Sequence, residues 1–168
     1  MTIELKIARG LYHHIRRDLT RPHFHAAERV GFLYCREAQF GDATTLVLVS
    51  SYVPVADDLY IRDRKVGARI DGEAIRRAME AVMETGWGCF HVHMHDHKGT
   101  PALSLTDQRE IPRIIESLSV VRPEQVHGIF LLSKDRCVAL VRPPHVSKLA
   151  PATRISVVGY PLEIIEGV

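Results

Sequence analysis

The sequence predicts a mixed α/β domain in which a mostly antiparallel sheet is flanked by helices. Short apolar segments typical of strands occur along the whole chain, and they are interleaved irregularly with segments of helical periodicity. This irregular order favours a mixed sheet over the regular alternation of a parallel α/β fold. No internal repeat or linker divides the 168 residues, a length that suits one domain with a buried core. The chain 1–168 is therefore expected to be a single domain.

Composition excludes several classes of protein. Apolar residues make up 46% of the chain and charged residues 25%, values ordinary for a globular protein. The net charge of +2 has both signs interspersed, so neither nucleic acid nor membrane is an expected partner. Apolar runs are too short to span a bilayer, and the first residues lack the apolar core of a signal peptide. Cys35, Cys89 and Cys137 are scattered, which suits reduced thiols and a cytoplasmic location.

Strands are expected where apolar residues alternate or cluster. Two hairpins stand out: one is built around a turn at 39–43, and the other around Lys134-Asp135. The segment at 155–158 is expected to add a late edge strand. The full set of expected strands is 2–8, 28–36, 44–55, 87–93, 126–133, 136–142 and 155–158.

Three segments have the periodicity of amphipathic helices, namely 11–19, 71–84 and 105–118. Asp71 is a suitable N-cap for the second helix, and Gly86 is suited to end it. The expected core stripes are Ile75, Ala78, Met79, Val82 and Met83 in the second helix, and Ile111, Ile114, Ile115 and Leu118 in the third.

The stretch 89–107 carries the strongest functional signal. His91, His93, His95 and His97 occur at alternate positions. Alternation places these side chains on one face while the chain stays extended. Two imidazoles separated by one residue can reach the same ion, and neutral imidazole is a preferred ligand of zinc. The residues 91–97 therefore predict a metal site.

Residues that complete such a site follow the histidines. A polar loop with glycine and proline leads to Ser104-x-x-Asp107, which is the pattern of a helix N-cap with an acid three residues later. A cap also serves as a rigid mount for a ligand. Candidates for the third ligand are Asp96, His97 and Asp107, and a separate carboxylate such as Glu28 is needed as the base for a bound water.

Taken in order, these residues resemble the signature of the JAB/MPN metalloproteases, the JAMM motif. The resemblance runs from residue 28 to about residue 142, and the combined pattern is more specific than any of its pieces. It implies an MPN-like domain, similar to the cytidine-deaminase fold. The matching residues are Glu28-x-x-Gly31, Gly88-x-x-His91-x-His93 and Ser104-x-x-Asp107.

The resemblance implies a role for each of five residues. His91, His93 and Asp107 would hold zinc, with a water as the fourth ligand. Glu28 would be the general base and would pass the proton to the leaving amine. Ser104 would donate a hydrogen bond to the oxyanion, an interaction typically worth roughly 3 kcal/mol of barrier.

The chain departs from the family pattern in two places. Val92 and Met94 stand where the family usually has a small hydroxyl residue and a proline. The spacer between His93 and Ser104 is ten residues, where about seven is usual, and taking His93 and His95 as the pair would shorten it to eight.

The lead-in Gly88-Cys-Phe nevertheless favours His91 and His93 as the ligand pair. In that register His95 and His97 would lie in an enlarged loop at the rim of the site. Zinc bound through His91, His93 and Asp107 is therefore the expectation from the sequence.

The implied reaction is hydrolysis of an isopeptide or peptide bond at the C-terminus of ubiquitin or a ubiquitin-like protein. A short chain without a tail resembles the stand-alone prokaryotic members of the family. These are associated with ubiquitin-like or sulfur-carrier proteins and their E1- or E2-like enzymes, which are thus the expected partners. Fold alone does not fix the substrate.

Three alternatives remain open. The segment 91–97 approaches the His-x-His-x-Asp-His pattern of metallo-β-lactamases, but that fold is larger and would leave Glu28 and Ser104 without roles. A thiol hydrolase using Cys89 and His91 is disfavoured, since residues i and i+2 of one strand rarely reach the same substrate atom in line. A non-catalytic MPN-type scaffold would typically lack the metal ligands.

Overall fold

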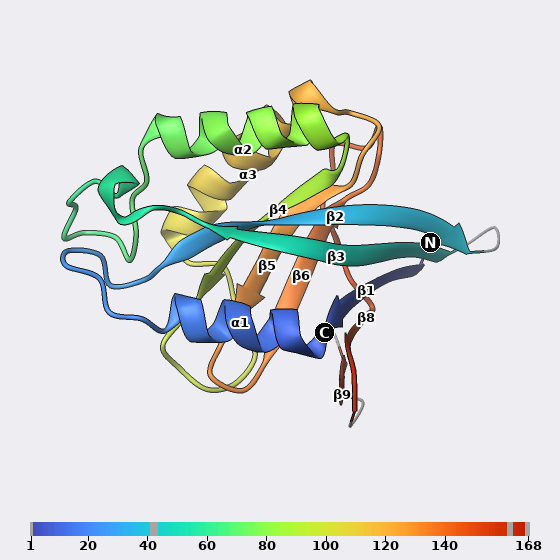
Figure 1. The fold of residues 1–168 in the computed structure, drawn as a ribbon, viewed down its shortest axis with the longest axis horizontal. Helices are drawn as coiled ribbons and strands as arrows, with labels where there is room; N and C mark the ends of the chain where they lie inside the picture. Colours follow the sequence, from blue (N-terminus) through green and yellow to red (C-terminus); the bar gives the residue numbers. More distant parts are fainter. Residues whose placement is uncertain (1, 41–43, 161–162, 167–168) are drawn as a thin grey trace.

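The computed structural model describes residues 2–40, 44–160 and 163–166, which form one curled sheet and three α-helices (Figure 1). The strand order across the sheet is β7-β6-β5-β4-β2-β3-β1-β8-β9. The elements are β1 (Thr2–Ala8), α1 (Arg9–Leu19), β2 (Val30–Phe40), β3 (Thr44–Pro54), the short 3₁₀ helix η1 (Asp57–Leu59), α2 (Gly72–Thr85), β4 (Gly88–Met94), α3 (Leu105–Val121), β5 (His127–Leu132), β6 (Cys137–Arg142), β7 (Ala150–Pro151), β8 (Arg154–Val158) and β9 (Glu163–Glu166).

The sheet is mixed and mostly antiparallel, as predicted. Among the described strands, β1 pairs in parallel with β3 and β8, and β4 pairs in parallel with β5. The other pairs, β2 with β3 and β4, β6 with β5 and β7, and β8 with β9, are antiparallel. These findings confirm a mixed α/β fold.

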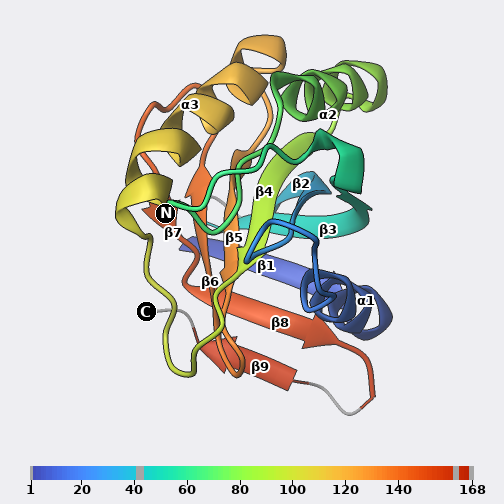
Figure 2. The ribbon, with the colours of Figure 1, turned by 90° about the vertical axis from the view of Figure 1, so that its left-hand side faces the viewer.

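Helices cover both faces of the sheet (Figures 1 and 2). The core on one side includes buried residues of α1 and β1, and the core on the other side includes buried residues of α2 and α3. Every residue of β4 and β5 is buried between these layers. Side chains on β4 that point toward α3 are therefore shielded from bulk water along the strand.

The predicted helix boundaries are largely confirmed. The Asp71 side chain accepts a hydrogen bond from the Glu73 N–H at 2.9 Å, and Gly86 ends α2 with a left-handed φ of 69°. The prediction that Met83 belongs to the core is wrong, because this residue is 58% exposed. Met83 lies about 140° of helical turn from the buried Ala78. Ala74, one turn before Ala78, is buried and belongs to the core face of α2. The four expected core residues of α3 are all buried.

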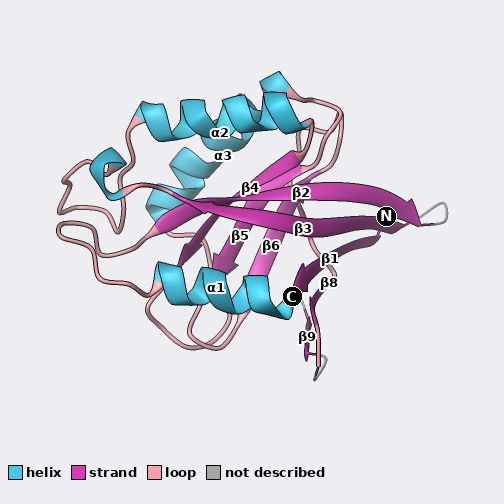
Figure 3. Cartoon of the chain, viewed as in Figure 1, coloured by secondary structure: helices cyan, strands magenta, loops and turns pink. Residues whose placement is uncertain are grey.

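Two strand predictions need correction. The segment at 28–29 is a loop and β2 begins at Val30, because the Glu28 N–H donates to the Gly67 oxygen at 3.0 Å instead of joining the sheet. The loops 20–29 and 60–71 thus lie side by side at one end of the molecule (Figure 3). The strand at 155–158 is not an edge, because β9 pairs along its outer side. Residues 41–43 of the predicted turn lie outside the described residues.

None of the helices in the described ranges is both long enough and apolar enough to cross a membrane.

Candidate metal centre

The end of β4 presents histidines at alternate positions on one face of the sheet. His91 and His93 are 5% and 2% exposed, and both line one cavity beside α3. The His95 N–H donates to the Leu132 oxygen at 2.9 Å, one residue beyond the last β4–β5 pair. The chain therefore stays extended through His95, which remains in line with His93. His97 is exposed, and its Nδ1 lies 2.9 Å from the Lys98 oxygen.

The first turn of α3 supplies a carboxylate to this face. The Ser104 hydroxyl accepts a hydrogen bond from the Asp107 N–H at 3.1 Å, and the Ser104 N–H donates to Asp107 Oδ2 at 2.8 Å. This capping box confirms the predicted N-cap. It also fixes the Asp107 carboxylate at the start of α3, so the cap and the mount for a ligand are the same structure.

Three side chains meet at distances suited to one metal ion. The Nε2 atoms of His93 and His95 are 3.2 Å apart. Asp107 Oδ1 is 3.3 Å from His93 Nε2, and Asp107 Oδ2 is 3.5 Å from His95 Nε2. Tetrahedral zinc with bonds of about 2.0–2.1 Å needs ligand atoms about 3.3–3.4 Å apart. The spacing and the N, N, O donor set of these residues therefore fit zinc.

Glu28 stands beside the two histidines. Its carboxylate and one ring nitrogen each of His93 and His95 all lie within 4.8 Å of one another. Gly67 makes room for this carboxylate, because a Cβ at Gly67 would lie 2.5 Å from Glu28 Cδ. Glu28 is thus held close to the candidate ligands by a loop that is distant in sequence.

Burial and neighbouring charges set the protonation of the carboxyl groups. Burial raises the pKa of Glu28 above its ordinary value, the charge of His93 opposes this rise, and that of Asp107 adds to it. Burial also acts to raise the pKa of Asp107, but hydrogen bonds with His93 and Ser104 outweigh it and the net pKa is lowered. Asp107 is therefore ionised at neutral pH, as a ligand must be.

Burial keeps two of these histidines, His91 and His95, in the neutral form. Burial, reinforced by the charge of His93, lowers the pKa of His91 to about 3. The same two causes, with burial the larger, lower the pKa of His95. A neutral imidazole has a free lone pair, which is the form that binds metal.

His91 lies deeper along β4 than the group that meets Asp107. Its ring centroid is 5.3 Å from that of His93, and its ring makes an edge contact with Phe32 at 5.8 Å. Its Nδ1 is buried and has no hydrogen-bond partner among the described residues, and the same holds for Nδ1 of His93.

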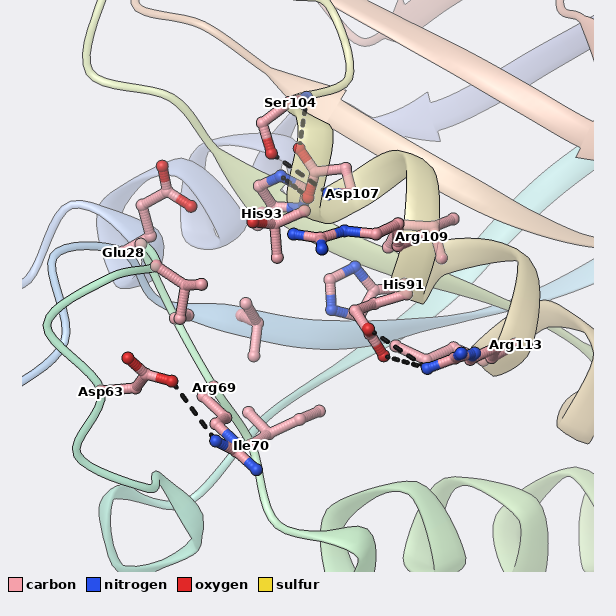
Figure 4. Close-up of a pocket in the computed structure, with 18 of the residues that line it drawn as sticks. Glu28, Asp63, Arg69, Ile70, His91, His93, Ser104, Asp107, Arg109 and Arg113 are labelled. Atoms are coloured by element: carbon pink, nitrogen blue, oxygen red, sulfur yellow. Dashed lines mark hydrogen bonds and ion pairs between the residues drawn. The ribbon is translucent and has the colours of Figure 1, made fainter.

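Most of these residues, though not His95, line one open cavity of about 840 Å³, shown in Figure 4. β4 contributes His91 and His93, α3 forms one wall, and the segment 63–70 forms the other. The structure thus brings together all five residues singled out from the sequence as lining of this cavity, namely Glu28, His91, His93, Ser104 and Asp107.

Two further residues belong to the arrangement. His95 contacts both His93 and Asp107, whereas the register predicted from the sequence puts it at the rim of the site. The alternate spacing of His95 with the other histidines was the feature of the sequence that could have indicated this position. Gly67 shapes the position of Glu28, and no pattern in the sequence pointed to it.

Comparison with known proteins adds no assignment: no family model matches the chain, and a search of curated protein sequences found no match.

Proposed function

We propose that this protein is a zinc-dependent hydrolase that cleaves peptide or isopeptide bonds at the C-terminus of a ubiquitin-like or sulfur-carrier protein. The observation that carries the proposal is the group of His93, His95 and Asp107, whose nearest atoms are 3.2–3.5 Å apart, with Glu28 beside it. Three ligands with a base close by are the requirements for hydrolysis by a metal-activated water. The resemblance of the spaced residues to the JAMM motif supplies the substrate class.

Each residue has a distinct role in this proposal. Zinc, when bound, supplies Lewis acidity and lowers the pKa of a bound water to about 7. His93, His95 and Asp107 would hold it. The Glu28 carboxylate accepts a proton from the attacking water and delivers it to the leaving amine. The Ser104 hydroxyl donates a hydrogen bond to the oxyanion, while its lone pair continues to accept from the Asp107 N–H.

The proposed pair of histidine ligands differs from the pair predicted from the sequence. Distances favour His93 with His95, because both Nε2 atoms approach Asp107. This pair also shortens the spacer before Ser104 to eight residues, closer to the family pattern. The pair His91 and His93 stays the prediction from the sequence, and metal binding by single variants separates the two.

The alternatives have weaker support. Cys89 is fully buried, and burial raises the pKa of its thiol well above the ordinary value, so a thiolate nucleophile is disfavoured. A scaffold without metal typically lacks the ligand residues, whereas two imidazoles and a carboxylate lie 3.2–3.5 Å apart here. Fixing three such groups face to face costs desolvation free energy that a bound cation offsets.

The proposal is tested with ubiquitin-like and sulfur-carrier proteins fused at their C-termini to a reporter. We expect cleavage with one zinc per chain and loss of cleavage when a chelator removes the metal. Glu28→Gln should keep zinc but lower the rate by about 10²–10⁴, the usual effect of losing a general base. Glu116→Gln, on the exposed side of α3, is the matched control and should cleave normally. Cleavage that survives chelation, or a fully active Glu28→Gln variant, would contradict the proposal.

A further inference from the structure

Among the polar side chains that line the cavity, His91 and Arg109 have no role in the proposed reaction and form no ion pair within the described residues. His91 projects from β4 into the cavity, is 5% exposed, and makes no hydrogen bond with any described residue (Figure 4). Burying a polar atom without a partner costs about 1–3 kcal/mol. The His91 side chain lines the cavity, so a hydrogen-bonding group of a substrate that enters the cavity can approach its ring.

The second side chain is Arg109 of α3. Three arginines line the cavity, and two of them are already paired: Arg69 with Asp63 at 3.3 Å, and Arg113 with Glu110 at 3.3 Å. Arg109 forms no ion pair within the described ranges, and its Nε donates to the Leu105 oxygen at 3.2 Å. That bond leaves the terminal NH₂ groups of the guanidinium free to donate to a ligand.

The two groups face one space from opposite elements. β4 places His91 on the floor of the cavity and α3 places Arg109 in its wall, as Figure 4 shows. Together they offer an imidazole and a cationic donor fork without a counter-ion. A carboxylate matches this pair, because it accepts two hydrogen bonds from a guanidinium and has lone pairs left for an imidazole N–H.

We propose that His91 and Arg109 form a specificity subsite that binds the carboxylate of an Asp or Glu side chain of the substrate, near the bond that is cleaved. The inference rests on the proposed function and deepens it, since it selects acidic C-terminal segments among the candidate ubiquitin-like and sulfur-carrier substrates. His91 is here a residue of substrate recognition and the metal is held by its neighbours.

The test measures binding without turnover. A set of labelled Ala/Gly decapeptides carries one Glu at each successive position, and a matched set carries Gln instead. Fluorescence anisotropy gives Kd for the full chain in the presence of chelator, so that no peptide is cut. At one or two adjacent positions we expect Glu to bind about tenfold more tightly than Gln, as a charge-assisted hydrogen-bonded pair allows. High salt should reduce the difference.

Variants assign the preference to the subsite. Arg109→Gln should remove it, Arg109→Lys should retain part of it, and His91→Leu should weaken it while His91→Asn keeps more. Arg17→Gln removes the same charge from α1, on the opposite face of the sheet, and should leave the preference intact. Equal binding of Glu and Gln peptides, a preference that survives Arg109→Gln, or no binding of any peptide would each overturn the inference. Cleavage of the fusion proteins then shows separately whether the proposed function stands.

Discussion

The four alternating histidines have different surroundings, and these decide what each can bind. His93 and His95 meet Asp107, His91 faces the cavity below them, and His97 is exposed beyond the end of the strand. Identical side chains at regular spacing thus take up different positions, because the strand extends one residue past β4 and then turns.

Single alanine variants of these histidines identify the metal ligands. We expect His93→Ala and His95→Ala to lose zinc, because each removes one corner of a three-ligand site. His91→Ala and His97→Ala should retain about one zinc per chain. Zinc titration of the four purified variants measures this. Zinc lost from His91→Ala and retained by His95→Ala would instead establish His91, His93 and Asp107 as the ligand set.

Gly67 provides a test of how Glu28 is positioned. In Gly67→Ala the new Cβ would lie 2.5 Å from Glu28 Cδ, so the carboxylate must move. The proposed base would then be displaced while the metal ligands stay in place. We expect cleavage to fall at least tenfold with normal zinc content. Gly72→Ala is the matched control, since no atom lies within 4 Å of a Cβ at Gly72. If the two variants are equally active, the position of the Glu28 carboxylate does not affect catalysis.

At the scale of elements, α3 both closes the cavity and fixes a ligand. Its buried face packs four apolar residues against the sheet, and its first turn holds Asp107 through the capping box with Ser104. The orientation of the carboxylate therefore depends on the same hydrogen bonds that begin the helix.

Ser104→Ala separates the structural role of this cap from a role in the reaction. Loss of the cap should lower the free energy of unfolding by about 1 kcal/mol. We expect kcat to fall by about 10²–10³, because an oxyanion donor is lost as well. Asp71→Ala removes the side-chain cap of α2 at a residue that does not itself line the cavity, and should show a similar loss of stability with normal kcat. If the two variants have the same kcat at low temperature, Ser104 serves only as a cap.

Local features of the chain were predictable from the sequence. The caps at Asp71 and Ser104 and the left-handed Gly86 depend on neighbouring residues, so residue type and spacing were sufficient. The gathering of Glu28 and Asp107 into one cavity agrees with the order of the motif. The fold class followed from the irregular order of strands and helices.

Long-range pairings were not predictable in the same way. The alignment of His95 depends on a hydrogen bond to Leu132, and the position of Glu28 depends on Gly67, each 37 or more residues away. The inner position of β8 depends on pairing with β1 at the other end of the chain. No local periodicity records such contacts, and each of these features therefore needed the structure.

At the scale of the whole molecule, the sheet joins the two ends of the chain while the site lies between elements from its middle. β8 pairs with β1, and β2, β4 and α3 surround the cavity. The candidate ligands come from two elements that contact each other only when the chain is folded. Metal binding should therefore be coupled to global folding.

Zinc should raise the thermal stability of the whole protein. A ligand that binds only the folded state at a hundredfold excess over its Kd adds about 2.7 kcal/mol to the free energy of unfolding. For a chain of this size we expect a rise in Tm of roughly 5–10 °C. Magnesium should have little effect, because it prefers oxygen ligands and octahedral geometry.

Scanning calorimetry with and without metal measures the shift. His93→Ala should abolish this shift, because the variant loses the imidazole that contacts both His95 and Asp107. His13→Ala removes an exposed histidine of α1 and should respond to zinc as the unmodified protein does. An equal shift in both variants would mean that zinc stabilises the fold from another place, and the centre at the end of β4 would lose its support.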